Sequence, residues 1–269
     1  MATRIVGVLN VTPDSFSDGG RLASVEEAVA AGLAMVADGA DWIDVGGEST
    51  RPGSQPVSEA EEIARVVPVI RGLSKHLTGT VRISVDTYKA ATARAALAEG
   101  ATAVNDVSGG LLDPEILGVT AAGGAAIVLG HLRGKPADMQ ASVHFDDVVD
   151  EVAHELGSRV AAARTAGCSE VWADPGIGFG KHLDHNLGLL KHLSRLRARL
   201  GVPIMVGVSR KRFIGDVTGK PASERVFGTA AAVAVAIMNG ADAVRVHDVA
   251  AMRDVVRVAE AIACAGELD

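Results

Sequence analysis

Eight short apolar runs of the sequence each end in a polar or charged residue, and segments long enough to form a helix separate them. In a (β/α)8 barrel, the carboxyl ends of all eight parallel strands meet at one rim, where the following loops build a pocket. One strand that ends at a polar residue means little, but eight in succession predict this α/β fold, a TIM barrel. The expected strands are residues 5–9, 42–45, 81–85, 103–104, 126–129, 171–173, 204–208 and 243–244.

The length of 269 residues fits one barrel domain over residues 1–269, because such domains take about 250 residues. Hydrophobic residues make up 48% of the chain and aromatic residues only 3%, so we expect a core of Ala, Val, Leu and Ile. Such residues suit parallel strands that are buried on both faces. The net charge of −7 argues against a nucleic-acid partner, which a basic patch would have to bind.

A cytoplasmic location with no membrane partner is also expected. No apolar run approaches the roughly 18 residues of a membrane-spanning helix, and the first expected strand begins too early for a signal peptide. Cys168 and Cys264 belong to no metal-binding or disulfide pattern.

The segments between the strands predict eight helices and three long loops. Residues 12–21, 46–57 and 133–145 follow strands 1, 2 and 5 and are rich in Gly, Pro, Ser and Asp. Long polar loops on the catalytic face of a barrel commonly cover the substrate. The expected helices are residues 24–38, 58–76, 89–99, 114–122, 146–166, 185–200, 223–239 and 250–265.

Three of the expected strand ends carry Asp86, Asn105 and Asp174. This set suits a flat heterocycle with a guanidine-like edge. A carboxylate can accept hydrogen bonds from a ring N–H and an exocyclic amine, and an amide can both donate and accept. The alternative is that each carboxylate caps the next helix or pairs with a lysine of the barrel.

Cationic side chains follow strands 7 and 8. Arg245 and His247 alternate at the end of strand 8, so their side chains point to the same face. Barrel enzymes often bind phosphate in this region, and the pair suits a diphosphate. The alternative for His247 is a core histidine with satisfied hydrogen bonds. Lys211 lies between Arg210 and Arg212, which predicts a cluster that attracts an anion rather than a solvated lysine.

Seven motifs are spread in order over the whole chain. They are NVTPDSFSDGG at 10–20, DVGGESTRPG at 44–53, SVDT at 84–87, NDVSG at 105–109, DPGIGFGK at 174–181, SRK at 209–211 and RVHD at 245–248. These motifs resemble those of the dihydropteroate synthases of folate biosynthesis. The resemblance implies that p-aminobenzoate displaces diphosphate from 6-hydroxymethyl-7,8-dihydropterin diphosphate, giving 7,8-dihydropteroate. It also implies a homodimer through outer helices.

The resemblance implies a role for each of the singled-out residues. Those implied to bind the pterin are Asp86, Asn105, Asp174, Lys211 and Phe179. Those implied to bind the diphosphate are Asn10, Thr50, Arg51, Arg245 and His247, with Asn10 also a ligand of Mg²⁺ and Asp18 organising the closed loops. Those implied to surround p-aminobenzoate are Phe16, Pro52, Ser209 and Lys211.

The implied catalytic step is dissociative. The electron-rich dihydropterin shares positive charge that develops on its exocyclic methylene, and Asp86 stabilises this charge. Lys211, Asn10, Arg245 and His247 complete the expected catalytic set. An aniline is a competent nucleophile when neutral, so no strong general base is required. Asp14, Ser15, Ser17 and Asp18 have the alternative of simply forming turns.

Two other functions share part of these motifs. A methyltransferase-like pterin-binding barrel would share Asp86, Asn105 and Asp174, but it has no reason to keep the diphosphate residues. A catalytically silent pterin-binding protein would be expected to lose some of them. Gly176, Gly178 and Gly180 are spaced one residue too closely for a dinucleotide fingerprint.

One position departs from the family pattern. Gly130 stands before His131 where the family usually has Met, so we expect a larger pterin pocket unless another side chain fills the space. The loops implied to contact p-aminobenzoate show no obvious insertion, which favours an enzyme susceptible to sulfonamides.

Overall fold

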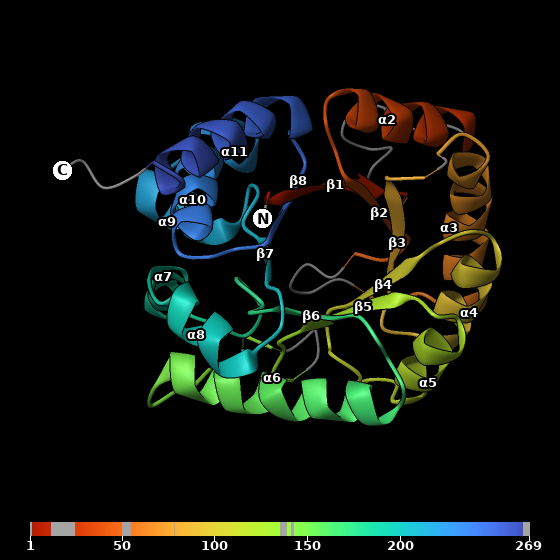
Figure 1. Cartoon of the computed structure of the whole chain (residues 1–269), viewed down its shortest axis with the longest axis horizontal. Helices are drawn as coiled ribbons and strands as arrows, with labels where there is room; N and C mark the ends of the chain where they lie inside the picture. Colours follow the sequence, from red (N-terminus) through yellow and green to blue (C-terminus); the bar gives the residue numbers. More distant parts are fainter. Residues whose placement is uncertain are drawn as a thin grey trace.

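The computed structural model describes residues 2–11, 25–49, 55–77, 79–134, 139–140 and 143–265. Within these residues, eight parallel strands form one sheet in the order β6-β5-β4-β3-β2-β1-β8-β7. An isolated parallel bridge between Ala173 and Ile204 brings the two ends of this order together. The result is the predicted (β/α)8 barrel, seen end-on in Figure 1.

All eight strands lie where the polar strand ends predicted them. Seven of them end one or two residues beyond the predicted run, because the added residues still pair with a neighbouring strand, whereas the seventh strand is one residue shorter than its run at each end. The strands are β1 Arg4–Asn10, β2 Trp42–Gly46, β3 Arg82–Asp86, β4 Ala103–Asp106, β5 Ala126–Gly130, β6 Val171–Asp174, β7 Met205–Gly207 and β8 Ala243–Val246.

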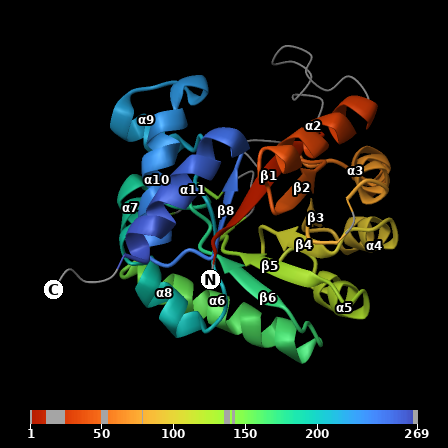
Figure 2. The same cartoon turned by 45° about the horizontal axis from the view of Figure 1, so that its top comes forward.

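The helices surround the barrel as an outer ring, and Figure 2 shows them lying obliquely along the strands. Their apolar faces pack on the sheet and form one large core cluster with the outward side chains of the strands. The helices are α2 Val25–Ala37, α3 Glu59–Ser74, α4 Ala90–Ala98, α5 Glu115–Ala122, α6 Val148–Thr165, α7 Leu183–Lys191, α8 Leu193–Leu200, α9 Arg212–Thr218, α10 Val226–Met238 and α11 Val249–Ala263.

Two helical features differ from the expectation. The single helix expected at 185–200 is divided at His192 into α7 and α8, and the amide of Asn239 donates to the carbonyl of Leu190 beside this break (2.9 Å). The short helix α9 follows β7 and was not expected; it begins after Lys211 and ends at Gly219, whose φ of 72° is left-handed. A left-handed glycine commonly terminates a helix.

The two ends of the barrel differ in chemistry. At the amino end, Trp42 and Trp172 meet edge to face with ring centroids 5.4 Å apart, and Arg82 lies over Trp42. Arg82 also donates to both carboxylate oxygens of Glu170 (2.7 and 2.9 Å). The core is otherwise mainly aliphatic, as the composition predicted. None of the described helices combines the length and apolar character needed to cross a bilayer.

The strand register brings the polar strand ends to one level of the barrel. Gly46 of β2 pairs with Asn10 on one side and Asp86 on the other, and Asp86 pairs in turn with Asn105. On the opposite wall, Asp174 pairs with Gly130, and Arg245 pairs with Gly207. The carboxyl rim therefore gathers polar residues that are far apart in the sequence.

Candidate active site

The centre of the rim is a network around the guanidinium of Arg245. Its Nε donates to Asp44 Oδ2 and its Nη2 donates to Asp86 Oδ2, both at 2.6 Å. Asp44 is buried and also accepts hydrogen bonds from Ser84 Oγ (2.6 Å) and Asn105 Nδ2 (2.9 Å). These contacts join β2, β3, β4 and β8 across the barrel. They hold Asp86 and Asn105, two of the predicted pterin residues, in one wall.

Asp44 is a site residue that the sequence analysis did not single out. It lies within the DVGG motif, two residues before Gly46, and therefore faces the barrel interior like Gly46. A buried carboxylate on the inward face of a strand needs a partner, and this is the signal that would have identified it.

Burial and neighbouring charge set the protonation of this network. Burial raises the pKa of Asp86 to about 7, against the opposing effect of Arg245 and with a smaller contribution from Asp44. Burial disfavours the charge of Arg245, but the carboxylates of Asp44 and Asp86 raise its pKa overall. Arg245 therefore stays charged, while Asp86 gains or loses a proton near neutral pH.

Lys211 and Asp174 form the opposite wall. The Lys211 ammonium donates to the carbonyl of Ile177 and lies 4.5 Å from the ring centroid of Phe179. Asp174 Oδ1 accepts a hydrogen bond from the backbone N–H of Gly176 (2.7 Å). The structure thus brings together all five predicted pterin residues, with three of them on this wall.

Lys211, Asp174 and Arg245 all lie close to Gly207. A Cβ at Gly207 would lie 3.7 Å from Lys211 Nζ, 3.8 Å from Asp174 Oδ2 and 3.9 Å from Arg245 Cβ. Burial raises the pKa of Asp174, and Lys211 opposes this. Burial lowers the pKa of Lys211 to about 8, and Asp174 opposes this. Each charge therefore stabilises the other inside the barrel.

Asn10, Ser209 and His247 also lie at the rim. A Cβ at Gly46 would lie 3.5 Å from both Asn10 Oδ1 and Asp86 Oδ2, so the lack of a side chain leaves this side of Asn10 open. Ser209 Oγ accepts a hydrogen bond from the backbone N–H of His247 (3.2 Å) and lies 3.0 Å from its Nδ1. His247 is half-buried, so the imidazole is not enclosed in the core.

The expected cluster of cations around Lys211 is not formed. Arg210 turns away to pair with Asp248, its Nε donating to Oδ2 at 3.0 Å. The side chain of Arg212 is 87% exposed and lies 3.5 Å from Asp216, one helical turn further along α9. Arg210 and Arg212 therefore point away from the other rim residues. Of the three basic residues 210–212, only Lys211 contributes positive charge to this wall.

The surroundings of Gly130 contradict the expectation of a larger pterin pocket. A Cβ at this position would lie 2.5 Å from the carbonyl oxygen of Val107, closer than two such atoms can approach. The backbone of Val107, not an empty pocket, occupies the place of a side chain at 130. The expectation of a larger pocket at this position is therefore wrong.

In each of two rim loops, a hydrogen bond between described residues joins the start of the loop to its end. Glu48 is buried, binds the ammonium of Lys89 and accepts from the backbone N–H of Val57 (3.2 Å). Arg133 Nη1 donates to the carbonyl of His144 (2.6 Å). These contacts close the stems of the loops after β2 and β5. The candidate residues that lie outside the described residues are Phe16, Asp18, Thr50, Arg51 and Pro52.

The fold and the rim define a class of protein: a (β/α)8 barrel enzyme whose carboxylates, amide and lysine suit a polar heterocycle. A family model described as pterin binding enzyme matches residues 6–247. Dihydropteroate synthase from Synechocystis sp. is 46% identical over 97% of this chain and 90% of that protein. The chain also matches a folate synthesis bifunctional protein of Arabidopsis thaliana at 41% identity, spanning 50% of its length.

Solved structures agree. Yersinia pestis dihydropteroate synthase with a sulfonamide drug superimposes with a TM-score of 0.92 at 40% identity, covering 98% of this chain and 95% of that one. The Xanthomonas albilineans enzyme with 4-aminobenzoic acid gives 0.90 at 46% identity, covering 98% and 94%. The chain therefore belongs to the dihydropteroate synthases, as its motifs predicted.

Proposed function

We propose that the rim residues of this chain carry out the dihydropteroate synthase reaction of folate biosynthesis. In this reaction, p-aminobenzoate displaces diphosphate from 6-hydroxymethyl-7,8-dihydropterin diphosphate, giving 7,8-dihydropteroate. The observation that carries the proposal is the arrangement of four rim residues. Asp86 and Asn105 lie on neighbouring strand ends, and Asp174 and Lys211 lie close together beside Gly207. The solved Xanthomonas albilineans relatives in complex with 4-aminobenzoic acid and with 7,8-dihydropteroate support it.

The pterin lies between the two walls in this proposal. Asp174 accepts hydrogen bonds from a ring N–H and the exocyclic amine, and Asn105 contacts another edge of the ring. The Lys211 ammonium reaches the pterin carbonyl and ring nitrogen in exchange for its present contact with Ile177. Phe179 lies beside Lys211 at the edge of the pocket. A ligand lacking these polar groups would leave buried partners unpaired, which supplies specificity.

The diphosphate and p-aminobenzoate occupy the outer part of the rim. Arg245 has already given two donors to Asp44 and Asp86, so it contacts the diphosphate through its remaining N–H groups. His247 is the second side chain that contacts the diphosphate. We propose that Ser209 and the stem of Lys211 border p-aminobenzoate. The roles proposed outside the described residues are Phe16 and Pro52 at p-aminobenzoate, Thr50 and Arg51 at the diphosphate, and Asp18 in loop organisation.

Mg²⁺ is the metal that this site would take. Asn10 offers a neutral amide oxygen next to the open face of Gly46, and hard cations such as Mg²⁺ prefer oxygen ligands. Within the described part of the chain, no three His, Cys, Asp or Glu side chains are placed to hold a metal, so diphosphate and water have to supply most ligands. When bound, the ion would neutralise negative charge on the leaving diphosphate.

The proposed step begins with cleavage of the bond between the exocyclic methylene and the diphosphate oxygen. The electron pair leaves with the diphosphate, and the dihydropterin ring delocalises the positive charge. The ionised Asp86 stabilises this charge through space. The amine of p-aminobenzoate then forms the C–N bond and loses one proton to water. The described rim residues bind and orient both substrates, which removes much of the entropic cost of the encounter.

Release of pyrophosphate separates this function from a methyltransferase-like barrel and from a silent pterin-binding protein. The purified protein should release one pyrophosphate per dihydropteroate formed when Mg²⁺ and both substrates are present. Omission of p-aminobenzoate is the control. Pterin binding without any pyrophosphate release would contradict the proposal.

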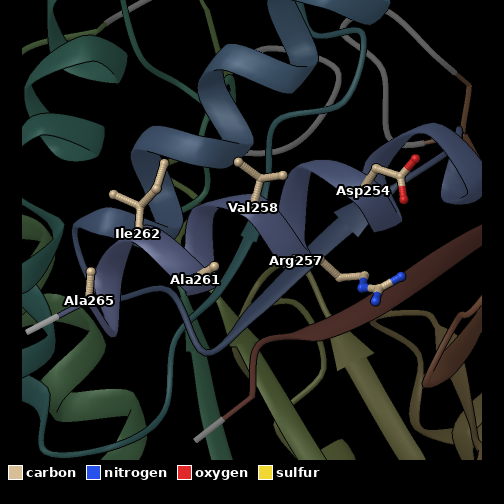
Figure 3. A pocket seen from close by; sticks show the side chains of 6 residues that line it. All are labelled: Asp254, Arg257, Val258, Ala261, Ile262 and Ala265. Carbon is tan, nitrogen blue, oxygen red and sulfur yellow. The ribbon is translucent and has the colours of Figure 1, made fainter.

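We also propose a homodimer through α10 and α11, which lie side by side on the outside of the barrel (Figure 1). Their outer faces expose large apolar side chains, including Phe227 (86% exposed), Val258 (59%) and Ile262 (60%). An exposed apolar patch of this kind typically marks an interaction surface. A shallow hollow of about 750 Å³ on α11 is lined by Asp254, Arg257, Val258, Ala261, Ile262 and Ala265 (Figure 3).

A cytoplasmic location completes the proposal. It is supported by Cys168, which is buried, and Cys264, which is exposed, because both are free thiols. Free thiols are typical of a reducing compartment.

A further inference from the structure

A buried lysine contacts the backbone behind Asp174, Lys211 and Phe179, which together are called the pterin wall. Lys181, the last residue of the DPGIGFGK motif, is only 3% exposed. Its Nζ donates to His131 Nδ1 (2.8 Å), the carbonyl of Phe179 (3.0 Å) and the carbonyl of Gly176 (3.1 Å). An ammonium has three hydrogens, so each of them has an acceptor. None of these acceptors is a carboxylate, which leaves the countercharge to be found elsewhere.

His131 connects this ammonium to a carboxylate. It is fully buried, and its Nε2 lies 3.1 Å from Glu155 Oε2. Because Nδ1 accepts from Lys181, Nε2 carries the hydrogen and donates it to Glu155, so the imidazole is neutral. Burial lowers the pKa of His131 to about 3, and the charge of Lys181 adds to this effect. The result is a continuous chain of carboxylate, neutral imidazole and ammonium.

Glu155 is itself fixed on α6. It accepts a hydrogen bond from Arg133 Nε (2.9 Å), and Arg159 Nη2 lies 3.8 Å from it. Although burial acts against ionisation, hydrogen bonds from His131 and Arg133 lower the pKa of Glu155 to about 2. Burial lowers the pKa of Lys181 well below its ordinary value, and the carboxylates of Asp174 and Glu155 oppose this effect. His131 Nδ1 and the two carbonyls still surround Nζ as hydrogen-bond acceptors.

The carbonyls bound by Lys181 belong to residues 175–181, which contact the pterin wall at three places. Gly176 donates its N–H to Asp174, Ile177 accepts from Lys211, and the ring of Phe179 lies beside the Lys211 ammonium. A Cβ at Gly176 would lie 1.9 Å from the carbonyl oxygen of His131, so the segment is packed tightly against His131. Lys181 therefore holds the backbone that supports these rim side chains.

We propose that Lys181 is a positioning residue for the pterin subsite and acts through His131 and Glu155. Its ammonium fixes residues 175–181 from the inside, so that Asp174, Phe179 and Lys211 have the geometry that pterin binding needs. Lys181 is buried beneath this segment and does not line the proposed pocket, so it is a positioning residue and not a catalytic one. The inference rests on the proposed function, because it names the support of the same subsite.

The test compares Lys181→Met with Lys191→Met, a matched change of an exposed lysine on α7. Calorimetry with 6-hydroxymethylpterin diphosphate is expected to give at least a tenfold higher Kd for Lys181→Met and an unchanged Kd for Lys191→Met. A folded Lys181→Met variant with wild-type affinity would overturn the inference. Wild-type protein that binds no pterin would instead contradict the proposed function.

NMR of the histidine side chains gives a readout that does not depend on activity. In the wild type, His131 should stay neutral, with hydrogen on Nε2, down to about pH 4, since its pKa is about 3. In Lys181→Met, Nδ1 loses its donor and the nearby cation, while Glu155 remains and Arg159 is the other charge nearby. His131 should then titrate at a higher pH. An unchanged titration would contradict the connection through His131.

A second variant keeps the test decisive if Lys181→Met does not fold. His131→Asn retains an oxygen that can accept from Lys181 but loses the connection to Glu155. We expect a several-fold rise in the Kd for the same pterin ligand. Wild-type affinity in this variant would overturn the inference.

Discussion

In the proposed function, the Lys211 side chain carries positive charge to the point where the two substrates and the leaving group meet. Lys211→Ala should lower kcat/KM by a factor on the order of 10² or more, comparable to the loss of one preorganised electrostatic contact. The fold should remain, because the residue lies at the rim rather than in the apolar core. Steady-state kinetics and a thermal melt measure both quantities. Arg212→Ala, which removes an exposed neighbour, is the control. Unchanged kinetics in a folded Lys211→Ala variant would contradict the assignment.

The same residue predicts the alkaline side of the pH profile. Because burial lowers the pKa of Lys211 to about 8, the ammonium loses its proton as the pH rises through this value. Values of kcat/KM should therefore fall about tenfold per pH unit above pH 8, since this ratio reports groups of the free enzyme. Lys211→Arg keeps the charge and should move any remaining activity to higher pH. A flat profile between pH 7 and 10 would show that the charge of Lys211 is not needed.

Replacing the Asp174 carboxylate by an amide tests its role in pterin binding. In Asp174→Asn, an amide presents hydrogen-bond donors where the pterin also presents donors, so binding should weaken by roughly 2–5 kcal/mol. Calorimetry with a pterin diphosphate analogue measures this loss. Asp216→Asn, on the partly exposed side of α9, should bind the analogue like the wild type. If both variants bind equally well, the pterin pocket lies elsewhere.

Strand ends can be located from sequence, but contacts across the barrel cannot. Asp86, Asn105 and Asp174 were predicted because each follows an apolar run, and the register brings them to the rim. The inward position of Asp44 can be read from the sequence, but its partner cannot, because the contact depends on how far Arg245 reaches across the barrel. The burial of Lys181 likewise depends on how tightly residues 175–181 fold against His131.

At the scale of elements, the apolar runs and the helix-length segments between them predicted the strands and most helices. Gly39, Gly100 and Gly240 have φ values of 108°, 108° and 93°, which explains why a helix ends before each of them. The division at His192 was not predictable, because the amide that binds Leu190 comes from Asn239, which directly follows α10. The helix α9 is only seven residues long, too short to show a clear apolar period.

Gly130 gives a test of how closely two elements pack. Gly130→Ala places a Cβ 2.5 Å from the carbonyl oxygen of Val107, so the β4 loop or β5 has to shift. Overpacking of this kind should destabilise the protein by about 1–3 kcal/mol in urea unfolding. Gly157→Ala, inside α6 with no atom within 4 Å of the new Cβ, should instead stabilise by about 0.5–1 kcal/mol. Equal stability of Gly130→Ala and the wild type would show that the approach to Val107 is not tight.

At the scale of the whole molecule, the barrel separates stability from chemistry. The amino end is closed by Trp42, Trp172 and the Arg82–Glu170 pair, none of which reaches the rim. At the carboxyl end, Asp44 is buried, Asp86 and Arg245 are partly buried, and the three groups depend on one another. Removing one of them leaves its partner unpaired in a buried site, which costs far more than an exposed ion pair does.

The outer surface predicts the state of assembly. If α10 and α11 face a second copy, each buried apolar side chain contributes roughly 1.5–3 kcal/mol to the dimer. Changing Val258 and Ile262 to Asp in every subunit should therefore raise the dimer Kd by a factor on the order of 10³ or more. Sedimentation velocity at micromolar concentration should show a dimer for the wild type and a monomer for the double variant.

The control for this change is Leu111→Asp, which replaces an apolar side chain of similar exposure (58%) in the segment between β4 and α5. This variant should remain a dimer, since its site lies away from α10 and α11 in both views of the barrel (Figures 1 and 2). Circular dichroism checks that each variant keeps its fold. A wild-type monomer at every concentration would contradict the dimer. A double variant that still dimerises would place the interface elsewhere, because two buried carboxylates per subunit cannot be accommodated in an apolar contact.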